Sequence, residues 1–130
     1  KDLTLPFHSQ AQNAATATRC AGEQDRYWQV YEAMYEQQEC LVCQGAESIA
    51  SSQNLNTKDL IDCMKKDSIQ NVINSNLSEA KLHNIRSTPT FVIGPNQQNG
   101  KHRGKIIEGA LPWTQFKAIL DQQLKMIPSS

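Results

Sequence analysis

Apolar residues recur three and four positions apart along most of the chain, which is the period of an amphipathic helix. The pattern is interrupted at residues 40–45 and then resumes. It predicts five helices, at about residues 9–22, 23–37, 46–54, 57–64 and 68–80. A further helix should begin near Pro112, with a buried face formed by Trp113, Phe116, Ile119, Leu120 and Leu124.

Polar residues and glycine mark the expected ends of these helices. Ser9 followed by Gln12 matches an N-cap with a capping box, and Gly22 is expected to end that helix. Thr57 is expected to be the N-cap of the helix predicted at residues 57–64. The second helix carries apolar and aromatic residues at helical spacing, which we interpret as a stripe facing the core: Tyr27, Trp28, Val30, Tyr31, Met34 and Tyr35.

Three segments have the composition of strands. Residues 1–7 alternate leucine and phenylalanine with polar residues, which predicts a short strand. Residues 90–93 are β-branched and aromatic and predict a buried strand, and residues 105–109 predict its hairpin partner. A basic cluster falls on the polar tip between them and is interpreted as a solvated turn: Lys101, His102 and Arg103. The order of elements predicts an α/β fold with a helical block set between strands.

Composition narrows the functional classes. At 130 residues the chain should form a single domain. Thirteen basic residues balance thirteen acidic ones, so charge offers no case for binding nucleic acid or an anionic membrane. The chain also has no run of 18 apolar residues, the length that would indicate a membrane span.

Four cysteines are the main chemical clue, and they allow three disulfide connectivities. Cys40 and Cys43 have CxxC spacing, and so short a loop gains little stability from closure, so the pair is either redox-active or incidental. Cys20 and Cys63 each fall on an amphipathic helix, and a bond between them would contribute about 3–4 kcal/mol. Two buried free thiols are the alternative. A zinc site is less favoured, because only one pair has ligand spacing.

The sequence around Pro89 resembles a known loop. Thr88-Pro89-Thr90-Phe91, preceded by a polar helix and followed by a strand and a helix, resembles the cis-proline loop of DsbA-like thiol:disulfide oxidoreductases. The likeness extends over nearly the whole chain. The segments that look like this family's helical insertion are Leu5-Pro6-Phe7-His8, Cys20-Ala21-Gly22-Glu23-Gln24, Tyr27-Trp28 and Asp62-Cys63-Met64.

The resemblance implies a thioredoxin-like α/β fold with an incomplete N-terminal half and an all-helical insertion. Residues 1–7 would be a strand remnant, residues 8–84 the helical insertion, and residues 85–130 the cis-Pro loop, hairpin and last helix. The Thr88–Pro89 bond would be cis, and Thr88, Pro89 and Thr90 would bind the substrate backbone. Cys20 and Cys63 would form a structural disulfide. No cofactor or metal is implied.

In the resembling family a CxxC opens the first helix, directly after the first core strand. We expect this chain to begin after both, as a mature or trimmed chain without its signal segment. The implied location is extracytoplasmic, in the periplasm or cell envelope, with cysteine-containing proteins as substrates and a membrane-bound or soluble redox partner. Without that strand, the strand at residues 90–93 would have an open edge, which we expect a second copy of the chain to cover.

Two other interpretations stay open. The chain could be a non-catalytic thioredoxin-like module that holds a partner without a redox step. Alternatively, Cys40 and Cys43 could be the working pair. The resemblance implies that a longer parent protein would be an oxidoreductase. It leaves open whether this chain is itself an enzyme.

Overall fold

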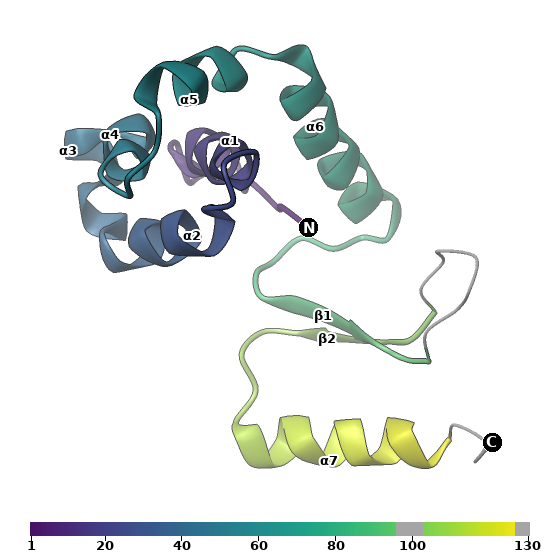
Figure 1. Ribbon diagram of the computed structural model, residues 1–130. Coiled ribbons are helices and arrows are strands. Elements are labelled where there is room, and N and C mark those ends of the chain that lie inside the picture. The colour runs from purple at the N-terminus through teal and green to yellow at the C-terminus, as the bar shows by residue number, and fades with distance from the viewer. Residues whose placement is uncertain (96–102, 127–130) are drawn as a thin grey trace. The chain divides into compact units, whose positions relative to one another are not determined.

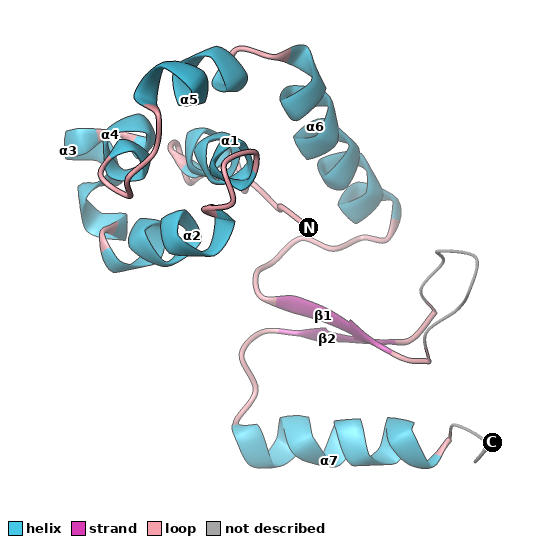
Figure 2. Ribbon diagram, in the orientation of Figure 1, coloured by secondary structure: helices cyan, strands magenta, loops and turns pink. Residues whose placement is uncertain are grey.

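The computed structural model describes residues 1–95 and 103–126, which belong to two compact units, Lys1–Asn84 and Ile85–Ser130. Among the described residues, the first unit contains helices and no strand, and the second contains a two-stranded sheet and one helix (Figure 1, Figure 2). The described structure is therefore mostly helical, with a smaller share of strand than the predicted α/β arrangement. No described helix is both long and apolar enough to cross a bilayer.

The predicted helices of the first unit are present with shifted ends. The interruption at residues 40–45 is not a loop. It begins with the last residue of a 3-10 turn and continues as a single helical turn. The elements are α1 (Ala11–Gly22), α2 (Tyr27–Glu36), η1 (Gln38–Cys40), α3 (Leu41–Gln44), α4 (Ala46–Ser51), α5 (Thr57–Met64) and α6 (Asp67–Leu82).

Two predicted N-caps are wrong. No side chain caps α1, which begins at Ala11, because Ser9 lies in the preceding turn rather than next to the helix. Asn56, and not Thr57, caps α5: its side-chain oxygen accepts hydrogen bonds from the N–H groups of the second and third helical residues, at 3.0 and 3.2 Å. Asn56 has the extended backbone of a cap, whereas Thr57 is already helical.

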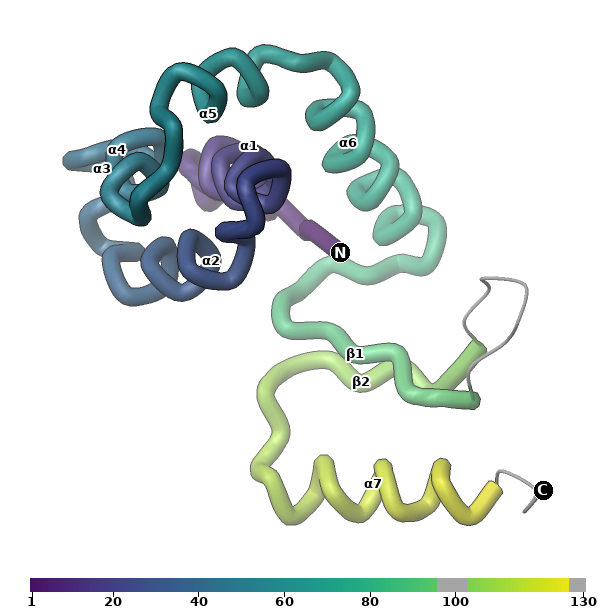
Figure 3. The backbone as a smooth tube through the Cα atoms, in the orientation of Figure 1, coloured from purple at the N-terminus to yellow at the C-terminus, as the bar shows by residue number. Residues whose placement is uncertain are grey.

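Helix α1 is the centre of the helical unit. It packs against α2, α4, α5 and α6, and Figure 3 shows the tube of α1 enclosed by these neighbours. Ala17 and Ala21 are fully buried on it, and such small side chains let the neighbouring helices approach closely. The hydroxyls of Thr16 and Thr18 are also buried, and each donates to a backbone carbonyl one turn earlier, at 2.8 and 2.7 Å.

Larger residues from the surrounding helices complete this core. Val30 of α2, Ile49 of α4 and Leu60 of α5 are fully buried against the small-residue face of α1. The loop after α1 is joined to the start of α5 by the Gln24 side chain, whose oxygen accepts from the N–H of Asn56 at 2.8 Å. This hydrogen bond ties the loop after α1 to the N-terminus of α5, beside the core.

A disulfide between Cys20 and Cys63 joins α1 to α5 inside this core. Their Cα atoms lie 5.7 Å apart, and the residues are 0% and 2% exposed. The bond closes a loop spanning a sequence separation of 43, so it removes many conformations from the unfolded chain. The second disulfide, between Cys40 and Cys43, spans a separation of three and joins only the consecutive turns η1 and α3.

Residues 1–7 form no strand, so that prediction is wrong. The segment is instead held by polar contacts to helices. The Asp2 carboxylate accepts hydrogen bonds from the Arg19 guanidinium at 2.5 Å and from the Asn76 amide at 3.2 Å, and Lys1 forms an ion pair with Glu79. A strand needs a neighbouring strand for its backbone groups, and the described part of this unit offers only helices.

The second unit contains β1 (Thr90–Ile93), β2 (Lys105–Glu108) and α7 (Trp113–Lys125). The strands pair antiparallel, with Phe91 opposite Ile107 and Val92 opposite Ile106. One face of the hairpin meets α7, where the rings of Phe91 and Phe116 lie 4.9 Å apart. Of the predicted basic tip, Arg103 is exposed, and Lys101 and His102 lie outside the described residues.

This second unit buries little apolar surface. Among its described residues only Ile107 is buried, at 5% exposure, and α7 has no buried residue. Phe91, Val92, Trp113 and Leu124 are all exposed. The predictions of a buried strand and of a buried face on the last helix are therefore wrong, because the spacing of apolar residues shows that a face exists and not that something covers it.

Removing the Cys20–Cys63 bond should destabilise the helical unit. The double substitution Cys20→Ala with Cys63→Ala is expected to lower the free energy of unfolding by about 3–4 kcal/mol, because a long loop is no longer closed in the unfolded chain. Urea unfolding followed by far-UV circular dichroism measures this. The matched variant Cys40→Ala with Cys43→Ala should lose about half of that or less. Equal losses for the two variants would contradict this account.

Candidate functional site

The first candidate site is the turn that leads into β1. The Thr88–Pro89 peptide bond is cis, as the resemblance predicts. The Pro89 carbonyl accepts a hydrogen bond from the N–H of Gly109 at 2.8 Å, and the Thr90 hydroxyl donates to the Ser87 carbonyl at 2.7 Å. These bonds hold the turn from within the unit and leave the side chains of Thr88 and Pro89 exposed.

The register of the hairpin shows where the backbone groups of β1 point. Pro89 faces Gly109 as a hydrogen-bonded pair, and such pairs alternate along an antiparallel ladder. Phe91 and Ile93 therefore bond to β2, and the N–H and C=O groups of Thr90 and Val92 point to the opposite edge. Within the described residues, β2 is the one strand beside β1, so that edge carries no partner strand.

The face of the hairpin that points away from α7 carries exposed apolar side chains. Val92 and Ile106 lie opposite each other on this face, and both are exposed. An extended chain laid along the open edge would therefore meet backbone donors and acceptors together with an apolar side chain. The predicted site residues Thr88, Pro89 and Thr90 lie at the start of this edge.

The second candidate site is the Cys40–Cys43 disulfide in the helical unit. The Cα atoms lie 5.0 Å apart, Cys43 is exposed, and Cys40 is partly exposed. Val42, between the two cysteines, is 78% exposed. Cys40 and Cys43 are therefore joined on the surface, whereas Cys20 and Cys63 are joined in the core. Since all four cysteines are paired, none is a free thiol in this structure.

Gln44 distinguishes the two sulfur atoms of the surface pair. Its Nε2 donates a hydrogen bond to Cys40 Sγ, with the two atoms 3.3 Å apart. Cys43 Sγ instead lies 3.2 Å from an acceptor, the Cys40 carbonyl oxygen. An N–H donor favours a negative charge on the atom that it faces. Gln44 therefore favours the thiolate form of Cys40 once the bond is opened.

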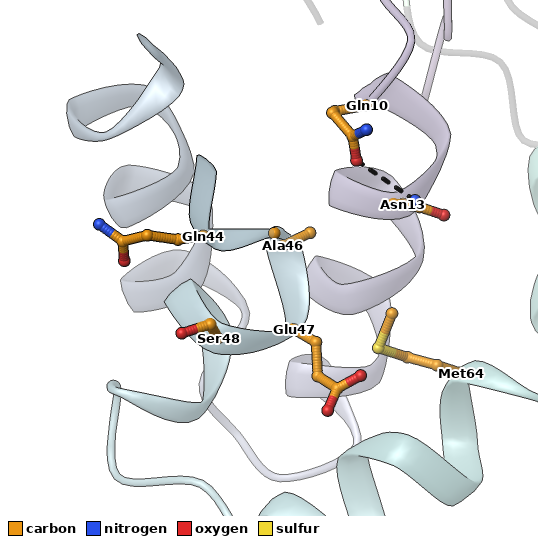
Figure 4. A pocket seen from close by; sticks show the side chains of 8 residues that line it. Gln10, Asn13, Gln44, Ala46, Glu47, Ser48 and Met64 are labelled. Atoms are coloured by element: carbon orange, nitrogen blue, oxygen red, sulfur yellow. Dashed lines mark hydrogen bonds between the residues drawn. The ribbon is translucent and has the colours of Figure 1, made fainter. Parts of the chain in front are cut away.

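The surroundings of this pair are acidic and partly hollowed. Between Arg26 and Lys58 the sequence has four glutamates and neither lysine nor arginine. A groove of about 700 Å³ begins where the chain leaves Cys43, and Glu47 is the one charged residue that lines it (Figure 4). The other lining residues are Gln10, Asn13, Gln44, Gly45, Ala46, Ser48 and Met64.

The aromatic residues of α2 form a surface ladder and not the predicted core stripe. Trp28 and Tyr35 are 67% and 60% exposed, and the rings of Tyr31 and Tyr35 lie 4.9 Å apart. Val30 and Met34 of the predicted stripe are buried, as expected, and they form the buried face of α2 together with Ala33. Burial raises the pKa of the Tyr27 phenol, and a hydrogen bond with Tyr31 raises the pKa of Tyr35.

Sequence reasoning missed two features of these sites. The sequence predicts that Val92 lies in a buried strand. Only the strand register shows that its N–H and C=O groups point to the open edge. The hydrogen bond from Gln44 to Cys40 was not predicted, although the position of Gln44 four residues after Cys40 places the two on one face of a helical turn. That spacing was the available signal.

A protein-family model described as thioredoxin, which represents the DsbA-like thioredoxins, matches residues 1–122. This match covers both units and both candidate sites. No curated protein and no solved structure matches the chain.

Proposed function

Because the chain belongs to the DsbA-like thioredoxin family, we propose that it takes part in thiol–disulfide exchange with cysteine-containing proteins. The step that we assign to the second unit is substrate binding. Thr88, Pro89 and Thr90 begin the binding surface, and the open edge of β1 continues it. The observation that carries this assignment is the unpaired edge of β1, directly after the Thr88–Pro89 turn.

Strand addition is the mode of binding that this edge supports. A polypeptide in extended conformation would pair with the N–H and C=O groups of Thr90 and Val92, as in other cases where a peptide extends a sheet. Backbone hydrogen bonds give affinity for many sequences, which suits a protein that must accept different unfolded substrates. The exposed Val92 side chain adds apolar contact.

Binding of this kind serves the chemistry of exchange. In that reaction a thiolate attacks one sulfur of a disulfide, a mixed disulfide forms, and a second thiolate resolves it. The rate depends on how well the substrate sulfur is aligned, and a substrate held along a strand edge has few orientations. Electrons pass between sulfur atoms, so the proposed reaction requires no cofactor.

We further propose that the protein works in an oxidising compartment, such as the periplasm. Both cysteine pairs are joined as disulfides, one in the core and one on the surface. Structural disulfides persist where the surroundings are oxidising and are rare in the cytosol. The balanced net charge of the chain neither favours nor opposes this location.

Blocking the open edge should weaken substrate binding. Val92→Pro removes an N–H that points away from β2, so the hairpin should persist while strand addition is blocked. We expect the affinity for a labelled, extended cysteine-containing peptide to fall about tenfold or more, because a lost hydrogen bond and its desolvated partner cost about 1–3 kcal/mol.

Fluorescence anisotropy measures this affinity, and Val92→Thr is the matched control. Threonine keeps the N–H, the branched shape and the strand propensity, so this variant should bind like the parent sequence. Equal binding by Val92→Pro and the unsubstituted chain would reject the open edge as the binding surface. Binding without any thiol exchange would favour the non-catalytic module.

Without substrate, we propose that the same edge pairs with the edge of a second copy. A two-stranded hairpin with one buried residue is marginal by itself, and an open edge readily recruits another strand. Pairing around a twofold axis would place β1 of one copy beside β1 of the other.

Sedimentation velocity over a range of concentrations tests this pairing. The unsubstituted chain and Val92→Thr should shift from monomer to dimer as concentration rises, and Val92→Pro should remain monomeric. Saturating peptide should return the unsubstituted chain to monomer, because peptide and second copy compete for one edge. A monomer at all concentrations would contradict the proposal.

A further inference from the structure

The surface disulfide is placed where stabilisation of the fold does not explain it. Cys40 and Cys43 lie within consecutive turns of one short helical segment, so their bond restrains neither α2 nor α4. The Cys20–Cys63 bond, by contrast, joins two helices and is shielded from solvent. A thiolate from outside can reach Cys43 without any movement of the core, whereas the buried pair is inaccessible in the folded unit.

The charge around the surface pair selects the kind of thiol that can approach. Glu36 and Glu39 precede the cysteines, Glu47 follows them, and the segment between Arg26 and Lys58 carries no positive side chain. An anionic thiol would approach against this charge, and a cationic one would be attracted. Glu47 also lines the groove beside the pair, where it can accept a lysine or arginine side chain (Figure 4).

We propose that Cys40–Cys43 is a second thiol–disulfide exchange site, whose partner is a cysteine within a positively charged polypeptide segment. This goes beyond the proposed function, because it uses no residue of the Thr88–Thr90 turn or of β1. The exposed Val42 side chain, between the two cysteines, offers the partner backbone an apolar contact.

The exchange proceeds in two balanced steps. A thiolate of the partner attacks Cys43 Sγ, the Cys43–Cys40 bond breaks, and Cys40 leaves as a thiolate while a mixed disulfide forms at Cys43. The thiolate of a second cysteine in the partner then attacks the partner sulfur of that mixed disulfide, a disulfide forms within the partner, and Cys43 leaves as a thiolate. The partner is oxidised to a disulfide by loss of two electrons, Cys40 and Cys43 are reduced, and the two thiolates take up the two protons that the partner released.

Exposure and hydrogen bonding decide which sulfur is attacked. Cys43 is the more exposed residue, so its sulfur receives the incoming thiolate. Cys40 is the better leaving group, because the Gln44 amide donates to its sulfur at 3.3 Å. Gln44 is thus a positioning residue: it favours one direction of cleavage and contacts no substrate atom.

The test uses two cysteine-containing peptides that differ only in flanking lysines or flanking glutamates. Each reacts with the full chain at matched thiolate concentration, and a small neutral disulfide serves as the reference reaction. Each peptide's rate is divided by its rate with the reference disulfide. On this scale the lysine peptide should open Cys40–Cys43 about fivefold faster or more than the glutamate peptide at low ionic strength. The difference should shrink to about twofold or less in 1 M salt, where charges are screened.

Substitutions then locate the charges. Glu39→Gln and Glu47→Gln should each reduce the preference for the lysine peptide, and Glu108→Gln, in the other unit, is the matched control that should not. Gln44→Ala should slow opening by either peptide and leave the preference unchanged. In all variants Cys20–Cys63 should stay oxidised.

Mass spectrometry of the trapped mixed disulfide tests the direction of attack. After rapid alkylation, the partner peptide should be on Cys43 and the alkyl label on Cys40. The reverse labelling would overturn the assigned direction. Equal normalised rates for the two peptides would overturn the assigned partner, and opening no faster than that of Cys20–Cys63 would overturn the exchange site itself.

Discussion

The Cys20–Cys63 bond, inside the small-residue core around α1, is the constraint on which the helical unit depends. It fixes α5 against α1, and the other helices pack on the faces of α1 that remain. Because α1 buries alanine and threonine rather than large side chains, close approach replaces bulk in this core. A covalent bond between two of its helices offsets the limited apolar area that such residues bury. In η1 and α3, Leu41 is the residue that packs against this core, and the second cysteine pair lies at the surface.

The second unit is governed by the opposite condition, a shortage of burial. Its hairpin and α7 bring apolar residues together around Ile107 and leave Val92, Ile106 and Trp113 in solvent. An open edge whose backbone groups belong to Thr90 and Val92 adds unpaired polar groups to that exposed apolar surface. Both features are resolved when an extended chain pairs with β1. Substrate binding in this account is therefore the completion of a sheet, and family membership supplies the chemistry that makes such binding useful.

Local chemistry in the sequence predicted local structure well. Periodicity located the helices around Ile49, Leu60 and Ile73, and the β-branched run located β1. Sequence pattern failed where neighbouring elements decide which face of a helix is buried or whether a segment becomes a strand. The aromatic residues of α2 share a face, but Val30 and Met34 lie on the face that meets α1. Residues 1–7 alternate like a strand but lie among helices, where Asp2 is held by Arg19.

The candidate sites divide in the same way. The cis Thr88–Pro89 bond and the Cys20–Cys63 pairing were predictable from the family resemblance, because spacing alone left three connectivities and free thiols open. The open edge at Val92 required the strand register, and the role of Gln44 required the distance to Cys40. Residue types alone show neither which backbone groups of a strand are paired nor which side chain donates a hydrogen bond to a sulfur atom.

Amide hydrogen exchange at β1, measured by nuclear magnetic resonance with and without an extended cysteine-containing peptide, tests the central claim most directly. The N–H groups of Thr90 and Val92 point to the open edge, and those of Phe91 and Ile93 already bond to β2. Peptide under conditions that keep the chain monomeric should slow exchange at Thr90 and Val92 and change it little at Phe91 and Ile93. Unchanged exchange at Thr90 and Val92, in the presence of bound peptide, would contradict substrate binding by strand addition.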